Sequence, residues 1–155
     1  MPITIHPFDT LFTTEIVNLH HASVHAIDSS IYSLEQEAWA HTPPNYPYWG
    51  KRLALKKPFV AMVEATIVGF IELEENGHID CAYTHPAYQK RGVMSTLYAY
   101  AQNVPHQKGI KRLFLEASIV AKPFFEKRGF VTLTRNEIKK NGQMIVNFSM
   151  EKILS

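Results

Sequence analysis

The chain is poor in the features that mark secreted and membrane-spanning proteins. It has one cysteine, Cys81, which excludes an internal disulfide and fits a reducing compartment. It contains no apolar run near the ~20 residues that a bilayer-spanning helix needs. Its first residues, Met-Pro-Ile-Thr-Ile-His, lack the cationic start and apolar segment of a signal peptide. These absences predict a cytoplasmic protein that does not enter a membrane.

The chain also lacks a strong excess of charge. A total of 16 Lys and Arg against 14 Asp and Glu leaves a formal net charge of +2 with the eight His neutral. Such a small excess argues against nucleic acid or a membrane surface as a partner. The hydrophobic content is 46% and the charged content 19%, as in ordinary globular proteins. We therefore expect residues 1–155 to form one domain, either a monomer or a homodimer.

Hydrophobic periodicity predicts helices in the first third of the chain and a strand-rich remainder. The expected helices cover residues 9–28, 34–41, 48–55, 88–104 and 121–128, and the expected strands cover 3–7, 59–64, 67–74, 78–85, 112–117, 130–139 and 144–153. Three prolines should keep residues 42–50 irregular, and Pro105 should end a helix. This order predicts an α/β protein with a mixed sheet and helices packed on it.

The most informative segment joins the expected strand 78–85 to the helix that follows. It carries Gln89, Lys90, Arg91 and Gly92. A loop at the start of a helix presents unpaired N–H groups and the positive end of the helix dipole, which favour a bound phosphate. Gly92 lets the backbone approach an anion without a Cβ in the way. We predict a phosphorylated ligand, and the absence of Walker and Rossmann patterns argues against a nucleotide-binding regulatory domain.

Two motifs of the second half extend this prediction. Tyr83-Thr84-His85-Pro86 is followed by Gln89-Lys90-Arg91-Gly92-Val93-Met94, and residues 121–130 read Ala-Lys-Pro-Phe-Phe-Glu-Lys-Arg-Gly-Phe. Together they resemble the central motifs of the GNAT superfamily of acyl-CoA N-acetyltransferases. Their residues are similar to those of the YafP-like branch of this superfamily. The resemblance implies a central twisted, mostly antiparallel sheet of about seven strands flanked by helices. It also implies acetyl-CoA as co-substrate.

The resemblance implies roles for single residues around that co-substrate. The backbone of Ala82, Tyr83 and Thr84 would pair with the pantetheine arm, as an added strand pairs with a sheet edge. Ser118 would lie beside pantetheine, and Phe124 and Phe125 would line the thioester channel. The pyrophosphate would be held by the backbone amides of Gln89, Lys90, Arg91, Gly92, Val93 and Met94 and by the hydroxyl of Ser95.

Two positions depart from the family pattern. Met94 replaces the usual Gly or Ala, so its N–H would serve the phosphate while its side chain turns away. Phe125 stands where many members carry a Tyr that protonates the departing CoA thiolate, and phenylalanine cannot donate a proton. Such an acid is not strictly needed, because CoA thiolate is a fair leaving group and oriented backbone donors can stabilise developing charge.

Acetyl transfer to an alkyl amine benefits from a base, and strand 78–85 offers candidates. Strict alternation places His78, Asp80 and Ala82 on one face and Cys81 and Tyr83 on the other. In many GNAT enzymes a carboxylate near the start of this strand is the base, so the resemblance implies Asp80 in this role, with His78 second. The alternative is that Asp80 is a partly exposed strand residue bonded to a neighbouring loop.

Aromatic residues and a histidine upstream of the strands fall where the family binds its acceptor. The resemblance implies that His25, Trp39, Tyr46 and Trp49 contact the acceptor, and rings on a proline-stiffened segment would suit a flat, apolar molecule. The alternative is that most of these rings only cover the sheet. His21 and His25 lie one helical turn apart, but no third ligand follows at a recognisable spacing, so we predict no metal site.

The basic run Lys51, Arg52, Lys56 and Lys57 has two interpretations, a solvated helix end or a contact with the 3′-phosphate of CoA. The complete set of residues predicts an N-acetyltransferase that moves the acetyl group of acetyl-CoA to the amine of a small-molecule acceptor by direct attack in a ternary complex. The alternative is a catalytically silent acyl-CoA-binding module with a sensor or regulatory role, which Phe125 makes credible.

Overall fold

A single seven-stranded sheet organises the computed structural model, which describes residues 2–27, 36, 39–140 and 142–154. The strand order is β1-β2-β3-β4-β5-β7-β6, and β4–β5 is the parallel pair among otherwise antiparallel neighbours. The strands are β1 (Thr4–His6), β2 (Phe59–Val63), β3 (Thr66–Leu73), β4 (His78–Thr84), β5 (Arg112–Ser118), β6 (Val131–Lys140) and β7 (Gln143–Ile153). The predicted mixed fold with a mostly antiparallel sheet is confirmed.

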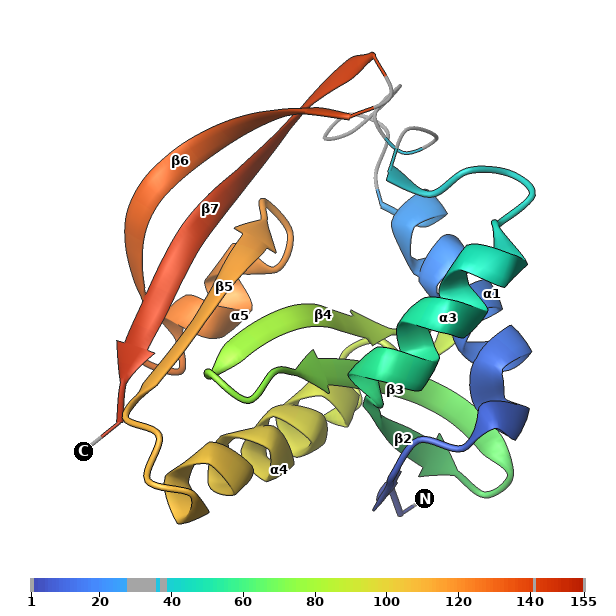
Figure 1. Ribbon diagram of the computed structural model, residues 1–155, viewed down its shortest axis with the longest axis horizontal. Helices are drawn as coiled ribbons and strands as arrows, with labels where there is room; N and C mark the ends of the chain where they lie inside the picture. Colours follow the sequence, from blue (N-terminus) through green and yellow to red (C-terminus); the bar gives the residue numbers. More distant parts are fainter. Residues whose placement is uncertain (1, 28–35, 37–38, 141, 155) are drawn as a thin grey trace.

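Helices cover both faces of this sheet (Figure 1). On one face α1 (Thr13–His25) and α3 (Tyr46–Lys56) form a core with β2 and β3 through seven buried side chains: Ile16, Val17, Leu19, Leu53, Val60, Ile67 and Phe70. On the other face lie α4 (Val93–Gln107) and the short α5 (Lys122–Glu126). The start of α4 sits close to β3 at Gly69, where a Cβ would lie 2.7 Å from Cγ1 of Val93. This close approach leaves no room for a side chain at position 69.

The observed helix bounds correct three expectations. A short 3-10 turn, η2 (Pro86–Tyr88), precedes the loop, so α4 begins at Val93 rather than at residue 88. It also continues past Pro105, because a proline removes only one helical N–H and Lys108 N still donates to Val104 O at 3.3 Å. Helix α3 begins at Tyr46, since proline is tolerated in a first turn and Asn45 caps it.

The expected helix 34–41 falls largely outside the described residues. The described helices include none with the length and apolar character needed to cross a lipid bilayer.

A bulge between β3 and β4 changes which side chains share a face. Glu72 pairs with Cys81 and Leu73 pairs with Ile79, so Asp80 is the extra residue on β4. The predicted alternation is therefore wrong at this point. Asp80 and Cys81 both contact the guanidinium of Arg52 on α3, while Ala82 packs against the core on the α4 side.

Strands β4 and β5 separate soon after they meet. Their pairing consists of His78 with Phe114 and Ile79 with Leu115, and beyond it the two strands diverge (Figure 1). At the other edge, β5 pairs with β7 only as far as Asn147, whereas β6 and β7 remain paired up to Lys140 and Gln143. Residues 137–140 and 143–146, here called the distal hairpin, therefore extend beyond the rest of the sheet. The hairpin arches toward the end of the molecule that holds α1 and α3 (Figure 1).

Candidate active site

Two adjoining hollows occupy the region where β4 and β5 separate. The larger, here called the large cavity, has a volume of about 480 Å³ and lies between α1, α3, β4 and the distal hairpin. The smaller, here called the narrow cleft, has about 80 Å³ and runs between β4, β5 and α5. Six residues line both: Trp39, Asp80, Cys81, Tyr83, Glu116 and Ser118. The two hollows thus meet at a junction floored by β4 and β5.

Aromatic rings form one wall of the large cavity. The ring of His20 on α1 lies between Trp49 and Tyr83, with centroid distances of 4.6 Å and 4.7 Å. Trp39 Nε1 donates a hydrogen bond of 3.1 Å to the hydroxyl of Tyr83. Trp39 and Trp49, two of the expected acceptor residues, line this cavity, and so does His20, which was not among them.

Two other expected acceptor residues do not line the large cavity. His25 Nε2 bonds to the backbone oxygen of Ala40 at 2.7 Å, and its ring stacks on His21. The Tyr46 hydroxyl donates to Asn18 Oδ1 at 2.6 Å on the outer side of α1 and α3. His21, one turn before His25 on α1, reaches the cavity instead. His25 and Tyr46 are thus not among the residues that line this cavity, since their side chains are engaged by Ala40 and Asn18.

Burial of His20 makes folding stability depend on pH. Burial first, and then the charges of Lys140 and Arg52, lower the pKa of His20 from 6.5 to about 3. Between these values the unfolded chain binds a proton that the folded chain excludes, so stability is complete above pH 6.5 and falls as the pH falls toward 3. The slope from this one group is at most about 1.4 kcal/mol per pH unit.

We therefore expect His20→Gln to flatten the decline in stability between pH 7.5 and pH 4.5. Urea denaturation at several pH values measures this slope, with His6→Gln on β1 as the matched control for the loss of an imidazole elsewhere in the sheet. A His20→Gln variant that loses stability on acidification as steeply as the wild type would show that His20 is not the group responsible.

Asp80 lies at the junction but is held by two cations. Its Oδ2 accepts from Nη2 of Arg52 at 3.0 Å and from Nζ of Lys56 at 2.9 Å. Burial alone would raise the pKa of Asp80, but the hydrogen bond from Lys56 and the charge of Arg52 outweigh it and hold this pKa below its usual value. A carboxylate stabilised in this way is a weak base.

His78 is held between two carboxylates. Its Nδ1 donates to Oε1 of Glu74 at 2.5 Å and its Nε2 donates to Oε1 of Glu116 at 2.7 Å. Carboxylates only accept, so both ring nitrogens carry a proton in this arrangement. Burial acts to lower the pKa of His78, but the hydrogen bonds to Glu74 and Glu116 raise it overall. An imidazolium held by both nitrogens cannot take up a further proton.

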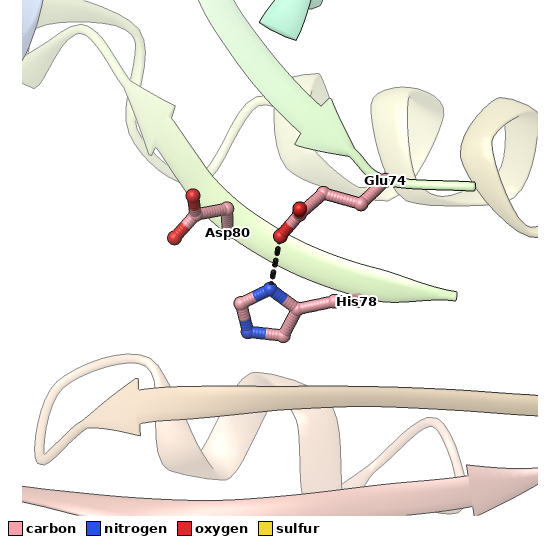
Figure 2. A group of neighbouring side chains, drawn as sticks. All are labelled: Glu74, His78 and Asp80. Carbon is pink, nitrogen blue, oxygen red and sulfur yellow. Dashed lines mark hydrogen bonds and ion pairs between the residues drawn. The ribbon is translucent and has the colours of Figure 1, made fainter. Parts of the chain in front are cut away.

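Glu74, His78 and Asp80 also form the group in the described structure that could hold a metal ion (Figure 2). One ligand atom from each lies within 4.8 Å of the others. The ammonium of Lys56 already bonds to Glu74 Oε2 at 3.2 Å and to Asp80 Oδ2 at 2.9 Å. The ammonium of Lys56 therefore already supplies the positive charge that a metal ion would bring to these carboxylates.

The floor of the site contains a buried ion pair that the sequence did not reveal. Glu72 is completely buried and accepts from Arg52 Nη2 at 2.6 Å and from Arg52 Nε at 3.2 Å. Arg52 and Lys56 lie one helical turn apart on the inner side of α3, so neither the solvated-end nor the 3′-phosphate interpretation of the basic run holds for them. The spacing of apolar residues on α3 could have indicated this contact, because it places Arg52 and Lys56 on the side of the helix that carries the buried Leu53.

The narrow cleft presents an open strand edge. Ala82, Tyr83 and Thr84 pair with β3 on one side, while their other side faces the gap left by β5. The carbonyl oxygen of Thr84 already accepts from Ser23 Oγ at 2.8 Å and from Gln89 Nε2 at 3.3 Å. The backbone of Ala82 and Tyr83 therefore offers the groups that an extended ligand arm could pair with.

The far side of the cleft is built by β5 and α5. Ser118 Oγ accepts from Ala121 N at 3.1 Å, which leaves its own hydrogen able to be donated into the cleft. Phe125 lines the cleft and is otherwise enclosed by the rings of Tyr98, Phe124 and Phe130. Phe124 packs against the core beside it. The position of Phe125 thus provides an apolar wall and no proton donor.

The loop before α4 has the backbone form of an anion site. Lys90 and Gly92 have positive φ angles of 61° and 82°, and a Cβ on Gly92 would meet no atom within 4 Å. The side chains of Lys90, Arg91 and Ser95 are exposed, whereas Val93 is buried and Met94 turns into the core. The amides of Gly92 to Ser95 thus lie at the open end of α4, where helices lack internal acceptors.

Arg128 adds a cation beside this loop that the sequence did not single out. Its Nη2 donates to Ser95 Oγ at 2.6 Å and its Nη1 donates to the backbone oxygen of Phe124 at 3.1 Å. The guanidinium also lies over the ring of Phe124, with its Cζ 3.6 Å from the centroid. This arrangement links α5 to the first turn of α4.

Known proteins resemble the chain in both sequence and fold. Residues 29–153 match the family model described as acetyltransferase (GNAT) domain. The chain is 37% identical over 123 residues to the uncharacterized N-acetyltransferase YafP of Escherichia coli K12, a match that covers 79% of this chain and 77% of YafP.

Solved structures give the same result. A GCN5-related N-acetyltransferase from Rhodopseudomonas palustris has a TM-score of 0.93 and 31% identity, with 99% of this chain and 97% of that one covered. The PaiA N-acetyltransferase of Thermoplasma acidophilum, solved in complex with coenzyme A, shares the fold with a TM-score of 0.75 at 22% identity over 99% of each chain. The family match spans both motifs of the sequence.

Proposed function

Because the chain belongs to the GNAT acetyltransferases, we propose that it transfers the acetyl group of acetyl-CoA to the amine of a small-molecule acceptor, with both substrates bound at once. The observation that carries this proposal is the junction between the narrow cleft and the large cavity, which share six lining residues. A thioester brought through the cleft would meet an amine held in the cavity at this point.

The donor would extend from the loop before α4 to the junction. The backbone amides between Gly92 and Ser95 suit a pyrophosphate, and the open edge at Ala82 and Tyr83 suits the amide groups of pantetheine. The complex of PaiA with coenzyme A supports the same ligand for this fold. Phe125 and Ser118 would flank the thioester end.

The acceptor would occupy the large cavity. Its volume of about 480 Å³ lies within the range that is usual for pockets that bind small molecules. Its wall of Trp39, Trp49 and Tyr83, with His20 neutral between two rings, favours an acceptor with an apolar, flat part. Proximity then does much of the chemistry, because a bound amine and thioester react as one molecule.

Calorimetric titration with acetyl-CoA, combined with a thiol-release assay over a panel of alkyl and aryl amines, tests this proposal. We expect saturable binding and release of CoA thiol that depends on both the amine and the enzyme. Binding without release by any amine in the panel would contradict transfer and favour the silent acyl-CoA-binding module. The absence of binding would contradict the donor site itself.

A further inference from the structure

Four ionisable side chains line both hollows, namely Asp80, Cys81, Tyr83 and Glu116. If the proposed acetyl transfer holds, the amine nitrogen and the thioester carbon meet at this junction. A group that takes a proton from the nitrogen must lie within hydrogen-bond reach of it. The base should therefore be one of these four residues.

Three of the four are unsuited to accept a proton. Asp80 is already bonded to two cations through Oδ2. Cys81 and Tyr83 can act as bases only after ionisation, and burial raises the pKa of both far above the neutral range. They therefore remain protonated at neutral pH and cannot serve as the base.

Glu116 differs from Asp80 in that it contacts one cation instead of two. It extends from β5 on the same side as Ser118, opposite the buried side chains of Leu113, Leu115 and Ala117. Its side chain is 42% exposed, and its Oε1 is fixed by His78 Nε2 at 2.7 Å. Among the described residues, none donates to Oε2, so one oxygen is oriented while the other remains available at the junction.

We propose that Glu116 is the general base of the acetyl transfer and that His78, anchored by Glu74, positions it. The neutral amine attacks the thioester carbon, the new C–N bond forms, and the nitrogen gains a positive charge. Glu116 takes one proton from this nitrogen. The C–S bond then breaks, the amide product forms and CoA leaves as a thiolate.

The same carboxyl group can complete the proton balance. Glu116 takes one proton from the nitrogen, and the CoA thiolate needs one proton to become a thiol. Glu116 lines the narrow cleft as well as the large cavity, so it faces both atoms of this exchange. A shuttle of this kind explains why Phe125 can replace a proton-donating residue at the thioester wall.

The titratable and charged groups around the junction come from β4, α1, α3, the segment before α3 and the distal hairpin. They are His78, Asp80, Cys81 and Tyr83 of β4, His20 and His21 of α1, Arg52 of α3, His41 and Lys140, while β7 contributes the uncharged Asn147. Arg52 is already paired with Glu72 and Asp80, so His78 is the cation in direct contact with Glu116. The rate should therefore depend on the Glu116 carboxylate and on its contact with His78.

Steady-state kinetics of Glu116→Gln test the proposal. We expect kcat/KM with a reactive alkyl amine to fall about 100-fold and the acidic limb of its pH profile to disappear, while the calorimetric Kd for acetyl-CoA stays unchanged. Glu75→Gln, an exposed turn residue near the same strands, is the matched control and should keep both rate and profile. His78→Gln should lower the rate by less and retain the limb.

Two results would overturn the proposal. One is a Glu116→Gln variant with wild-type rate and pH profile, and the other is loss of the limb in Asp80→Asn with acetyl-CoA affinity intact. Nitrogen-15 NMR of His78 adds a readout that needs no turnover, because Glu116→Gln should move the His78 titration to lower pH. An unchanged titration would contradict the Glu116–His78 pair even if no amine proved to be a substrate.

Discussion

Replacing Arg52 by methionine is expected to lower the free energy of unfolding by about 3–5 kcal/mol, because Glu72 would remain buried without its partner. Glu72 is completely buried, and both of its oxygens accept from the guanidinium of Arg52. Asp80 would lose one of its two cations in the same variant. Urea denaturation at neutral pH measures the difference, and the effect should exceed that of any other single substitution proposed for this site.

A matched control and a double variant make this result specific. Lys51→Met changes the exposed neighbour of Arg52 on the same helix and should alter stability by no more than about 0.5 kcal/mol. Adding Glu72→Met to Arg52→Met removes the unpaired charge, so much of the lost stability should return. If Arg52→Met alone were as stable as Lys51→Met, the buried pair could not be what fixes α3 to the sheet.

Gly92→Ala is expected to weaken acetyl-CoA binding about 10- to 100-fold, the equivalent of losing one charge-assisted hydrogen bond between backbone and phosphate. The φ of Gly92 is 82°, and the space where a Cβ would stand is open, so the new methyl group would occupy the place proposed for the phosphate. Calorimetry gives the Kd directly. Thermal unfolding of the free protein should change only by the strain of a positive φ, about 1 kcal/mol.

Gly109→Ala separates strain from blocked binding. Gly109 also has a positive φ, 75°, and a Cβ added to it would likewise meet no atom within 4 Å, but it follows the C-terminal end of α4. This variant should lose a similar amount of stability and keep the wild-type Kd. Equal losses of affinity in both variants would indicate a general effect of strain and would remove Gly92 from the proposed phosphate site.

Local patterns were sufficient for the parts of the molecule whose shape is set within a few residues. The period-two runs of apolar residues predicted the strands, since each strand has a buried face. The loop before α4 was readable only in part: Gly92 was assigned to it and has a positive φ, but the helix was expected from residue 88 and begins at Val93. Trp39 and Trp49, which lie on either side of the proline-containing segment, both line the large cavity, and their contact with an acceptor stays a prediction.

The charged floor of the site could not be read in this way. Arg52 and Glu72 are 20 residues apart, and their contact exists only after α3 packs on the sheet. The bulge at Asp80 depends on how β3 and β4 are paired, and a one-residue shift of this kind leaves no trace in the alternation of either strand. Glu116 was within reach of sequence reasoning, because it alternates with buried Leu115 and Ala117 and lies two residues before Ser118.

The two hollows are built largely by different stretches of the chain. Helices α1 and α3 near one end and the distal hairpin near the other wall the large cavity, whereas the middle of the chain, from β4 to α5, forms most of the narrow cleft. In the proposed function, the outer segments of the chain hold the acceptor and the central segment holds the donor. A chimera that joins the outer segments of one relative to the central segment of another would inherit acceptor choice from the first and donor binding from the second.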